Sequence, residues 1–394
     1  MKSLYRICRH LALIGATVVV SACGGSDDDP PPEPVGLSAP AAAASAVTSG
    51  GLVGVAFGML DDSRTELGHA GRRKLAGAPL EGNEHFIIGS NTKAMTAALA
   101  ARLVERGLLR WDTRIAEALP GITLHPAYRE VTLEQLLAHR GGVLALAGSP
   151  DLERFEAHLL AFEGPLPATP AQRRRFFSEW ALQQPPLPGV APGQTFLYSN
   201  AGYAVVGAML EAVSGQPWDR LFDEALARPL GISGSWVRPE LLGPQQTVGH
   251  AGPRGSVEVV PPFEPDAQAW FDVIAPAGLY STTPAAYAHW LRWHLRALRG
   301  ESTPLPQGYV QRLKALRTTP DDYAVGWAAV QVDGRALFVH TGHWAGYSAE
   351  VAVAADGRRA SFGLTNVGHF SEDGRSWVLE TIDQLLAEMD REST

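Results

Sequence analysis

The chain has 394 residues, of which 45% are hydrophobic and 19% charged, a composition typical of a globular protein with one large domain or two smaller ones. Its formal net charge of −8 argues against a nucleic-acid partner, because binding to phosphates requires a basic surface. Both cysteines, Cys8 and Cys23, precede the expected folded part, which therefore offers no disulfide and no thiolate metal site.

The first 22 residues have the pattern of a signal peptide. Basic residues at positions 2, 6 and 9 precede an apolar stretch, Leu11 to Val20, that is too short to span a bilayer. The small residues before Cys23 resemble the lipobox of bacterial lipoproteins, in which this cysteine is lipid-modified and becomes the N-terminus. We therefore expect a lipid anchor on Cys23 facing the periplasm, and Gly24 favours the outer membrane. The alternative is an ordinary signal peptide followed by an incidental cysteine.

Residues 23–46 contain runs of aspartate, proline and alanine without hydrophobic periodicity, which predicts a disordered tether, and the folded part is expected to begin near Val47. Two strands, Gly51–Met59 and Thr65–Ala70, come next. A mainly helical region then extends from the helix after Ser90 to about residue 276. Its predicted helices include Leu133–Ala138, Pro170–Leu182, Gly202–Val213 and Trp218–Ala227.

The C-terminal part has the alternation and turn residues of strands. A helix opened by proline, Pro284–Arg299, comes first, and a final helix runs from about Arg375 to Arg391. Strands at both ends of the chain predict one antiparallel sheet in an α+β domain over 47–394, with a sheet subdomain at about 47–93 and 277–394 and a helical subdomain at about 94–276. The predicted C-terminal strands are Tyr323–Val332, Arg335–Thr341, Tyr347–Ala354 and Arg359–Val367.

Ser90 and Lys93 mark the start of an alanine-rich helix. Ser90 stands at the expected N-cap position, apolar residues recur every four positions after it, and Gly107 predicts the end of the helix. One helical turn places Lys93 on the same side as Ser90. A serine becomes a nucleophile when a neighbouring base takes its proton, and burial lowers the pKa of a lysine toward that task. A capping serine followed by an exposed lysine explains this motif equally well.

Two further segments carry polar side chains at the ends of predicted elements. Tyr198 and Asn200 lie two residues apart at the start of an apolar helix. His340, Thr341 and Gly342 end a predicted strand. Taken singly, each segment is better explained by packing, helix capping or a turn than by a site.

The order of these three motifs resembles the serine β-lactamase and penicillin-recognising enzyme family. In particular, Tyr198-x-Asn200 is similar to the motif of class C β-lactamases, class C-like DD-peptidases and their esterase relatives. The resemblance covers roughly residues 47–390 and implies a β-lactamase/transpeptidase-like fold. It also implies a serine hydrolase that forms an acyl-enzyme with an amide or ester. The other matching segments are Gly107–Asp112, Val131–Gly142, Pro229–Ile232 and Pro276–Ser281.

The resemblance assigns catalytic roles residue by residue. Ser90 would be the acylated nucleophile and Lys93 its proton-relay partner. Tyr198, as a phenolate stabilised by nearby cations, would be the general base and then the general acid. The resemblance implies no metal and no cofactor. The expected partner is a small-molecule or peptide substrate, and the chain is expected to be a monomer.

The remaining implied residues bind the substrate. Asn200 would hydrogen-bond the acyl amide, and His340 and Thr341 would face a substrate carboxylate or the base network. Gly342 would allow the substrate to approach the strand closely. The backbone N–H groups of the nucleophile and of His343 would form the oxyanion hole.

His340 departs from the lysine that is usual in dedicated class C β-lactamases. Because histidine titrates near pH 6.5, we expect activity on carboxylate-bearing substrates to fall between about pH 6 and 8, and acylation by β-lactams to be followed by slow deacylation. DD-carboxypeptidase, weak β-lactamase and carboxylesterase activities stay open, as does a catalytically silent relative that binds a wall peptide. The segments Gly142–Glu163 and Gly249–Phe271 are expected to be loops that set the width of the pocket.

Overall fold

The computed structural model describes residues 36–146, 149–316, 322–332, 334–371 and 375–390. The expected signal peptide and Cys23 lie outside these ranges. Within them, no helix combines the length and the apolar character needed to cross a membrane.

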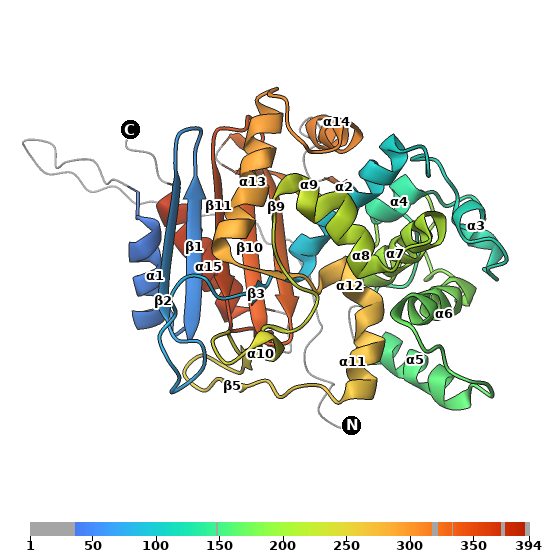
Figure 1. Ribbon diagram of the computed structural model, residues 1–394, viewed down its shortest axis with the longest axis horizontal. Helices are drawn as coiled ribbons and strands as arrows, with labels where there is room; N and C mark the ends of the chain where they lie inside the picture. The colour runs from blue at the N-terminus through green and yellow to red at the C-terminus, as the bar shows by residue number, and fades with distance from the viewer. Residues whose placement is uncertain (1–35, 147–148, 317–321, 333, 372–374, 391–394) are drawn as a thin grey trace, which may run out of the picture.

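A seven-stranded antiparallel sheet lies at the centre of the fold (Figure 1), in the order β2-β1-β11-β10-β9-β8-β7. The first long strand pairs with the last, so that Val55 faces Thr365. This confirms the prediction of one sheet built from both ends of the chain. The strands are β1 (Gly54–Leu60), β2 (Thr65–Gly71), β7 (Tyr323–Ala324), β8 (Trp327–Val332), β9 (Arg335–Trp344), β10 (Tyr347–Ala354) and β11 (Ala360–Thr365).

Helices cover both faces of the sheet and make up the other half of the molecule (Figure 1). Short pairings of β3 (Phe86–Ile87) with β6 (Ser281–Thr282) and of β4 (His250–Ala251) with β5 (Glu258–Val259) lie outside the main sheet. The helices are α1 (Ala39–Thr48), α2 (Thr92–Glu105), α3 (Ile115–Ala118), α4 (Leu133–Leu137), α5 (Ser149–Ala161), α6 (Pro170–Gln183), α7 (Asn200–Ser214), α8 (Trp218–Phe222), α9 (Arg228–Leu230), α10 (Pro239–Leu242), α11 (Pro265–Phe271), α12 (Ala275–Gly278), α13 (Pro284–Leu298), α14 (Gln307–Leu316) and α15 (Trp377–Met389).

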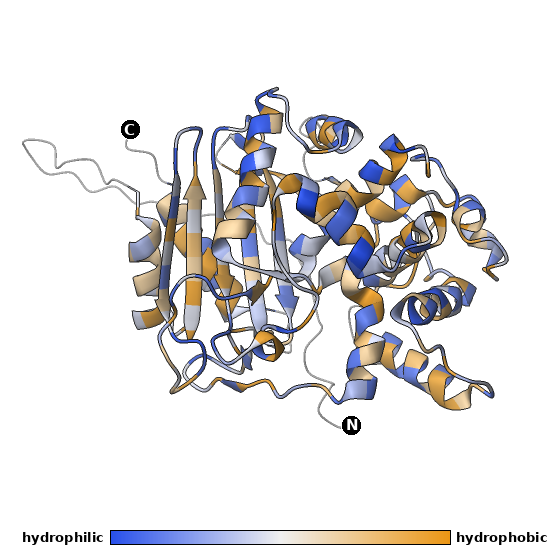
Figure 2. Cartoon of the chain, in the orientation of Figure 1, coloured by the Kyte–Doolittle hydropathy of each residue, from blue (hydrophilic) through white to orange (hydrophobic). Residues whose placement is uncertain are grey.

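Strand β1 contributes to two hydrophobic layers because its side chains point alternately to the two faces of the sheet. Val55 and Phe57 pack with α1 and α15 on one face, whereas Ala56 and Leu60 join the main core, which includes α13 and the helical half. Both faces are therefore covered, and β1 is drawn mostly in hydrophobic colours in Figure 2.

Helix α1 shows that the expected disordered tether over 23–46 is wrong for its last part. The alanine run is helical from Ala39, and four of its alanines, Ala39 among them, are fully buried against the sheet and α15. A Cβ on Gly68 of β2 would lie only 2.2 Å from Pro40 N of α1. The small residues on both elements therefore allow α1 to lie very close to β2. Alanine has the highest helix propensity, but a uniform run of it has no periodicity to detect. The folded part thus begins before Val47.

Two segments expected to be loops contain helices. Residues 142–163 include α5, and residues 249–271 include α11. The helices predicted at 133–138, 170–182, 202–213 and 284–299 are present within two residues at each end, as α4, α6, α7 and α13. The helix predicted at 218–227 is also present, as α8 that continues through a π-helical turn, Asp223–Ala227, into α9.

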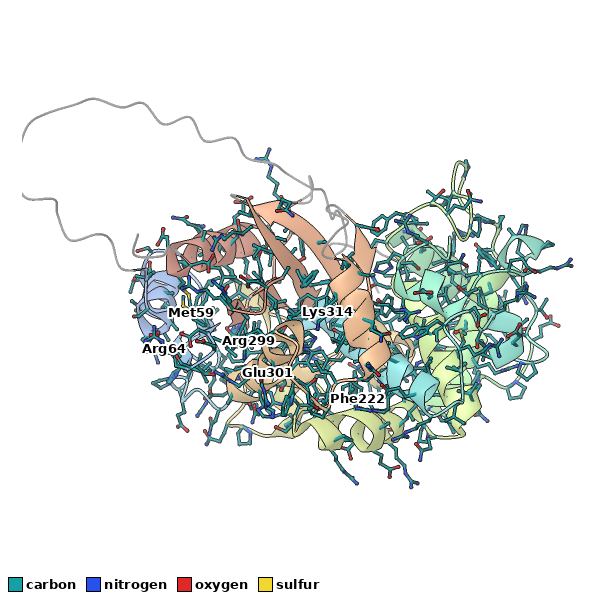
Figure 3. The ribbon with its side chains drawn as sticks, turned by 90° about the horizontal axis from the view of Figure 1, so that it is seen from above. Met59, Arg64, Phe222, Arg299, Glu301 and Lys314 are labelled. Atoms are coloured by element: carbon teal, nitrogen blue, oxygen red, sulfur yellow. The ribbon has the colours of Figure 1, made fainter. Side chains whose placement is uncertain are left out.

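Helix α2 joins the two halves of the molecule. Its residues from Thr92 to Ala101 are all buried. The apolar ones among them are part of a core that continues from the sheet into the helical half. Side chains fill the space between the two halves (Figure 3). Figure 3 also labels Arg299 and Glu301, which form an ion pair of 2.6 Å just after the end of α13. The first turn of α2 is therefore held from both sides, which fixes the position of Lys93.

Candidate active site

Ser90 lies in a single 3₁₀ turn, Gly89–Asn91, between β3 and α2. Helix α2 begins at Thr92, so the expected N-cap role of Ser90 is wrong. The Oγ atom instead lies 3.0 Å from Lys93 Nζ and 2.8 Å from the Tyr198 hydroxyl oxygen. The serine hydroxyl is thus contacted by two proton-transfer groups.

Lys93 is fully buried, and burial lowers its pKa well below the usual value for a lysine. Its Nζ lies 2.8 Å from Asn200 Oδ1, 2.7 Å from the Ala277 carbonyl oxygen and 3.0 Å from Ser90 Oγ. A neutral amine has two N–H donors and one lone pair. When the amine is protonated, its three N–H donors match the three oxygens, and when it is neutral, Asn200 and Ala277 take its two donors and its lone pair faces the proton of the Ser90 hydroxyl.

Tyr198 donates its hydroxyl proton to Ser90 Oγ at 2.8 Å. Burial raises the pKa of Tyr198 above the usual value for a phenol. His340, whose pKa burial lowers to about 3, provides no cation to stabilise a phenolate, and burial lowers the pKa of Lys93 as well. The phenolate implied by the resemblance is therefore not the resting form, and Tyr198 stands as a proton donor.

His139 contacts Tyr198 and both of its chain neighbours, Leu197 and Ser199. Its backbone carbonyl accepts from Leu197 N–H at 2.8 Å, and its Nδ1 accepts from Ser199 N–H at 3.0 Å. Its ring lies 4.2 Å from the Tyr198 ring, and its backbone has φ +56°, in the left-handed region that non-glycine residues rarely occupy. Sequence reasoning gave His139 no role, because its contacts reach a segment 60 residues away.

His340, on β9, is buried and neutral. Its Nδ1 lies 2.6 Å from the Thr341 carbonyl oxygen and its Nε2 lies 3.0 Å from the Tyr323 hydroxyl. The neutral ring donates through Nδ1–H and accepts at Nε2, so that both nitrogens are paired. Burial, assisted by the nearby Lys93, lowers the pKa of His340 to about 3. The expected titration of His340 between pH 6 and 8 is therefore wrong.

Strand β9 passes very close to the serine turn because two glycines face each other there. A Cβ on Gly342 would lie 2.0 Å from Ile88 O and 3.1 Å from Ser90 N, and a Cβ on Gly89 would lie 2.2 Å from His343 N. The backbone nitrogens of Ser90 and His343 therefore border the same narrow gap. Two backbone N–H groups beside a nucleophile are the donors that an oxyanion hole requires.

A pocket of about 90 Å³ opens beside Ser90, with Asn200 and His343 also in its wall. Asn200 Nδ2 donates one hydrogen bond to the Leu146 carbonyl at 3.2 Å, which leaves its second N–H for a ligand. Among the described residues that line the pocket, none is charged. Its apolar walls include Leu146, Leu152, Phe155, Phe177, Trp270 and Trp344.

The three sequence motifs thus meet around Ser90, two of them at its hydroxyl oxygen and the third, through Gly342, beside its backbone nitrogen. Ser90, Lys93 and Tyr198 are in direct contact, while Asn200 holds Lys93 and His340 stands behind Tyr198. In the part of the chain that the structure describes, no three His, Cys, Asp or Glu side chains are grouped to hold a metal ion. A buried lysine, a phenol and backbone donors around a serine define the class of serine acyl-transfer enzymes.

Comparison with known proteins gives the family. The beta-lactamase family model matches residues 40–383, so the chain belongs to the beta-lactamase family, with its β-lactamase/transpeptidase-like fold. Penicillin-binding protein 4 from Amycolatopsis lactamdurans is 28% identical over 322 residues, which cover 77% of each chain. The chain is therefore a serine hydrolase of the type represented by penicillin-binding proteins and class C β-lactamases.

Two solved structures show the same fold. A class C beta lactamase from Rhodobacter sphaeroides superposes with a TM-score of 0.64 at 20% identity, over 89% of this chain and 99% of its own. A D-stereospecific amidohydrolase from Streptomyces sp. superposes with a TM-score of 0.64 at 21% identity, over 87% of this chain and 98% of its own.

Proposed function

We propose that this hydrolase cleaves amides or esters through an acyl-enzyme on Ser90 and requires no free carboxylate on its substrate. One observation carries the second part of the proposal. His340 occupies the position of a carboxylate-binding lysine in class C β-lactamases, yet it is neutral and hydrogen-bonded at both ring nitrogens. The pocket beside Ser90 also has no charged side chain among its described wall residues. A terminal carboxylate would therefore meet no fixed positive charge at either place.

In the proposed reaction, Lys93 Nζ takes the proton of the Ser90 hydroxyl as Oγ bonds to the carbonyl carbon of the substrate. The N–H groups of Ser90 and His343 stabilise the oxyanion, by roughly 3–4 kcal/mol each. The bond from carbon to the leaving nitrogen or oxygen breaks as Tyr198 donates its proton to that atom. The proton held by Lys93 then restores the Tyr198 phenol. A water molecule repeats these steps in place of serine and releases the acid.

The named relatives suggest which compounds to test first. One is a penicillin-binding protein and another is a D-stereospecific amidohydrolase. Both names support a peptide or amide substrate, and the second supports residues of D configuration. Short D-amino-acid peptides and their amides are therefore the first substrates to compare.

The test uses a matched pair, acetyl-D-alanyl-D-alanine and acetyl-D-alanyl-D-alaninamide, which differ only in the terminal carboxylate. We expect cleavage of the same central amide bond with kcat/KM values within about threefold of each other, because no cation favours the acid. Ser90→Ala should abolish both activities, together with the mass shift produced by a fluorophosphonate. A free acid cleaved more than ten times faster than its amide would contradict the proposal.

A second candidate is penicillin-binding or DD-carboxypeptidase activity. It is favoured by the relative from Amycolatopsis lactamdurans and by the order of the His340-Thr341-Gly342 segment after the other two motifs. Intact mass after incubation with a penicillin distinguishes the outcomes. A stable adduct on Ser90 supports this second candidate, rapid turnover supports a β-lactamase, and labelling by the fluorophosphonate alone supports the amidase or esterase.

We further propose that the protein is anchored to the outer membrane by a lipid on Cys23 and faces the periplasm. The pattern of the first 23 residues supports this location. Cys23→Ala should release the protein from the membrane fraction, whereas Cys8→Ala, within the leader, should leave it there. Equal membrane association of both variants would argue against the lipid anchor.

A further inference from the structure

We infer that the pocket beside Ser90 binds an aromatic side chain on the acyl part of the substrate. The inference rests on the proposed function, because it specifies a group carried by the substrate of that reaction. It is drawn from where the pocket lies relative to the proton donor and from what lines it.

The position of the pocket assigns it to the acyl part. Its wall contains Ser90, Asn200 and His343, but neither Tyr198 nor His340. Tyr198 must lie beside the leaving atom, since it donates the proton which that atom receives. The leaving group therefore extends along the Tyr198 side of Ser90, and the acyl group lies toward the pocket.

The wall of the pocket is suited to a neutral ring. Phe155 packs edge-on against Phe177 at 4.9 Å and 87° and against Trp270 at 5.4 Å and 76°, so an aromatic cluster forms one side. Trp344, which follows His343, contacts Phe271 at 5.2 Å and 71°, so a second aromatic pair also lines the pocket. A ligand ring would extend these edge-to-face contacts. The absence of charge in the described wall disfavours an ionised side chain.

The pocket is also held in place before a substrate arrives. Phe155 and Phe177 are 6% and 1% exposed, and they belong to the core through α5 and α6. Trp270 and Trp344 are only half-buried and stand nearer to the surface. Binding a ring here needs little ordering of the protein, which favours selectivity for the acyl group.

Two isomeric esters test the assignment directly. Methyl phenylacetate carries its ring on the acyl side, and benzyl acetate carries the same ring on the leaving side, while methyl acetate has none. We expect kcat/KM for methyl phenylacetate to exceed that for methyl acetate by about tenfold or more, since burying a ring outweighs the one-methylene differences that give 10- to 200-fold discrimination. Benzyl acetate should show a smaller gain. A larger gain for benzyl acetate, or no gain for either ester, would overturn the inference.

A pair of substitutions on α5 localises the effect. Leu152 lines the pocket and Leu160, on the same helix, is 83% exposed. Leu152→Trp should fill the pocket and lower the ratio of kcat/KM for methyl phenylacetate over methyl acetate by about tenfold. Leu160→Trp makes the same change on the surface and should leave the ratio and both rates unchanged. If Leu152→Trp does not fold, Trp270→Leu, which removes one ring from the wall, should lower the same ratio. An unchanged ratio in the folded variant contradicts the assignment.

These outcomes separate the inference from the function beneath it. If Ser90→Ala leaves ester hydrolysis unchanged, the proposed function fails. If Ser90→Ala abolishes hydrolysis of all three esters but the wild-type protein treats the two aromatic isomers alike, the function stands and the pocket assignment fails.

Discussion

The two sides of Ser90 are built in different ways. On one side lie the rings of Tyr198, His139 and His340, which pack together and are hydrogen-bonded to Ser90, Ser199 and Tyr323 respectively. On the other side lies an apolar pocket whose aromatic walls come mainly from α5, α6 and α11. The first side consists of polar groups packed around the proposed proton donor Tyr198, whereas the second has shape and hydrophobic surface but little hydrogen-bonding capacity.

This difference separates reactivity from selectivity. The proton-transfer groups sit next to one another around a single oxygen, so a change there should affect every substrate alike. The pocket touches Ser90 only at its edge and should change which acyl group is accepted. The predictions below test whether the two sides are in fact independent.

The largest effect is expected from Lys93→Met, which keeps an unbranched buried side chain but removes the base. We expect kcat/KM to fall by about 10²–10⁴-fold, and by the same factor for methyl acetate and methyl phenylacetate. Steady-state kinetics on both esters measure this, with thermal unfolding to show that the variant is folded. Lys74→Met, the same change at an exposed position, is the control. Unequal losses on the two esters would show that the two sides are coupled.

A smaller effect is expected from His139, which we interpret as a positioning residue for Tyr198. His139→Leu removes the acceptor for Ser199 N–H and should lower kcat about tenfold with little change in KM. His139→Asn retains a side-chain acceptor and tolerates the left-handed backbone, so it should recover much of this loss. Equal losses in the two variants would mean that the hydrogen bond does not position Tyr198.

The smallest effect is expected from a change of pH, because the preference for the acid over the amide should stay constant. Because burial holds the pKa of His340 at about 3, its ring stays neutral from pH 6 to 8. The ratio of kcat/KM for acetyl-D-alanyl-D-alanine over its amide should therefore not change across this range, whatever the pH dependence of the two rates themselves. A ratio that falls as pH rises would contradict this prediction and would support the charged His340 expected from the sequence.

The proton-transfer side was largely accessible from sequence, because its residues occur in short motifs at fixed spacing. Ser90 and Lys93 are one helical turn apart, and Tyr198 lies at a helix start. The protonation states were not accessible, since the pKa values of Lys93, Tyr198 and His340 depend on burial by elements distant in the chain. That is why both the phenolate and the titrating histidine were wrong.

The pocket side was hardly accessible from sequence. Apart from Ser90, its walls lie on elements between residues 146 and 344, and two of its helices, α5 and α11, were expected to be loops. Helix α1 was missed for a related reason, because its alanines provide no periodic contrast. Pattern reasoning detects local order, whereas a pocket or a tightly packed surface forms only when separate segments meet.

The pairing of the first long strand with the last has a consequence for when activity can appear. Thr365 donates a hydrogen bond to the Gly54 carbonyl across 311 residues, and the serine turn receives the second oxyanion donor from His343. At about 5–20 residues per second, a ribosome needs on the order of 15–60 s to make that intervening chain. During this time β1 lacks its partner on one edge and Ser90 lacks half of its oxyanion hole. We therefore expect a nascent or truncated chain to be inactive until the C-terminal strands close the sheet.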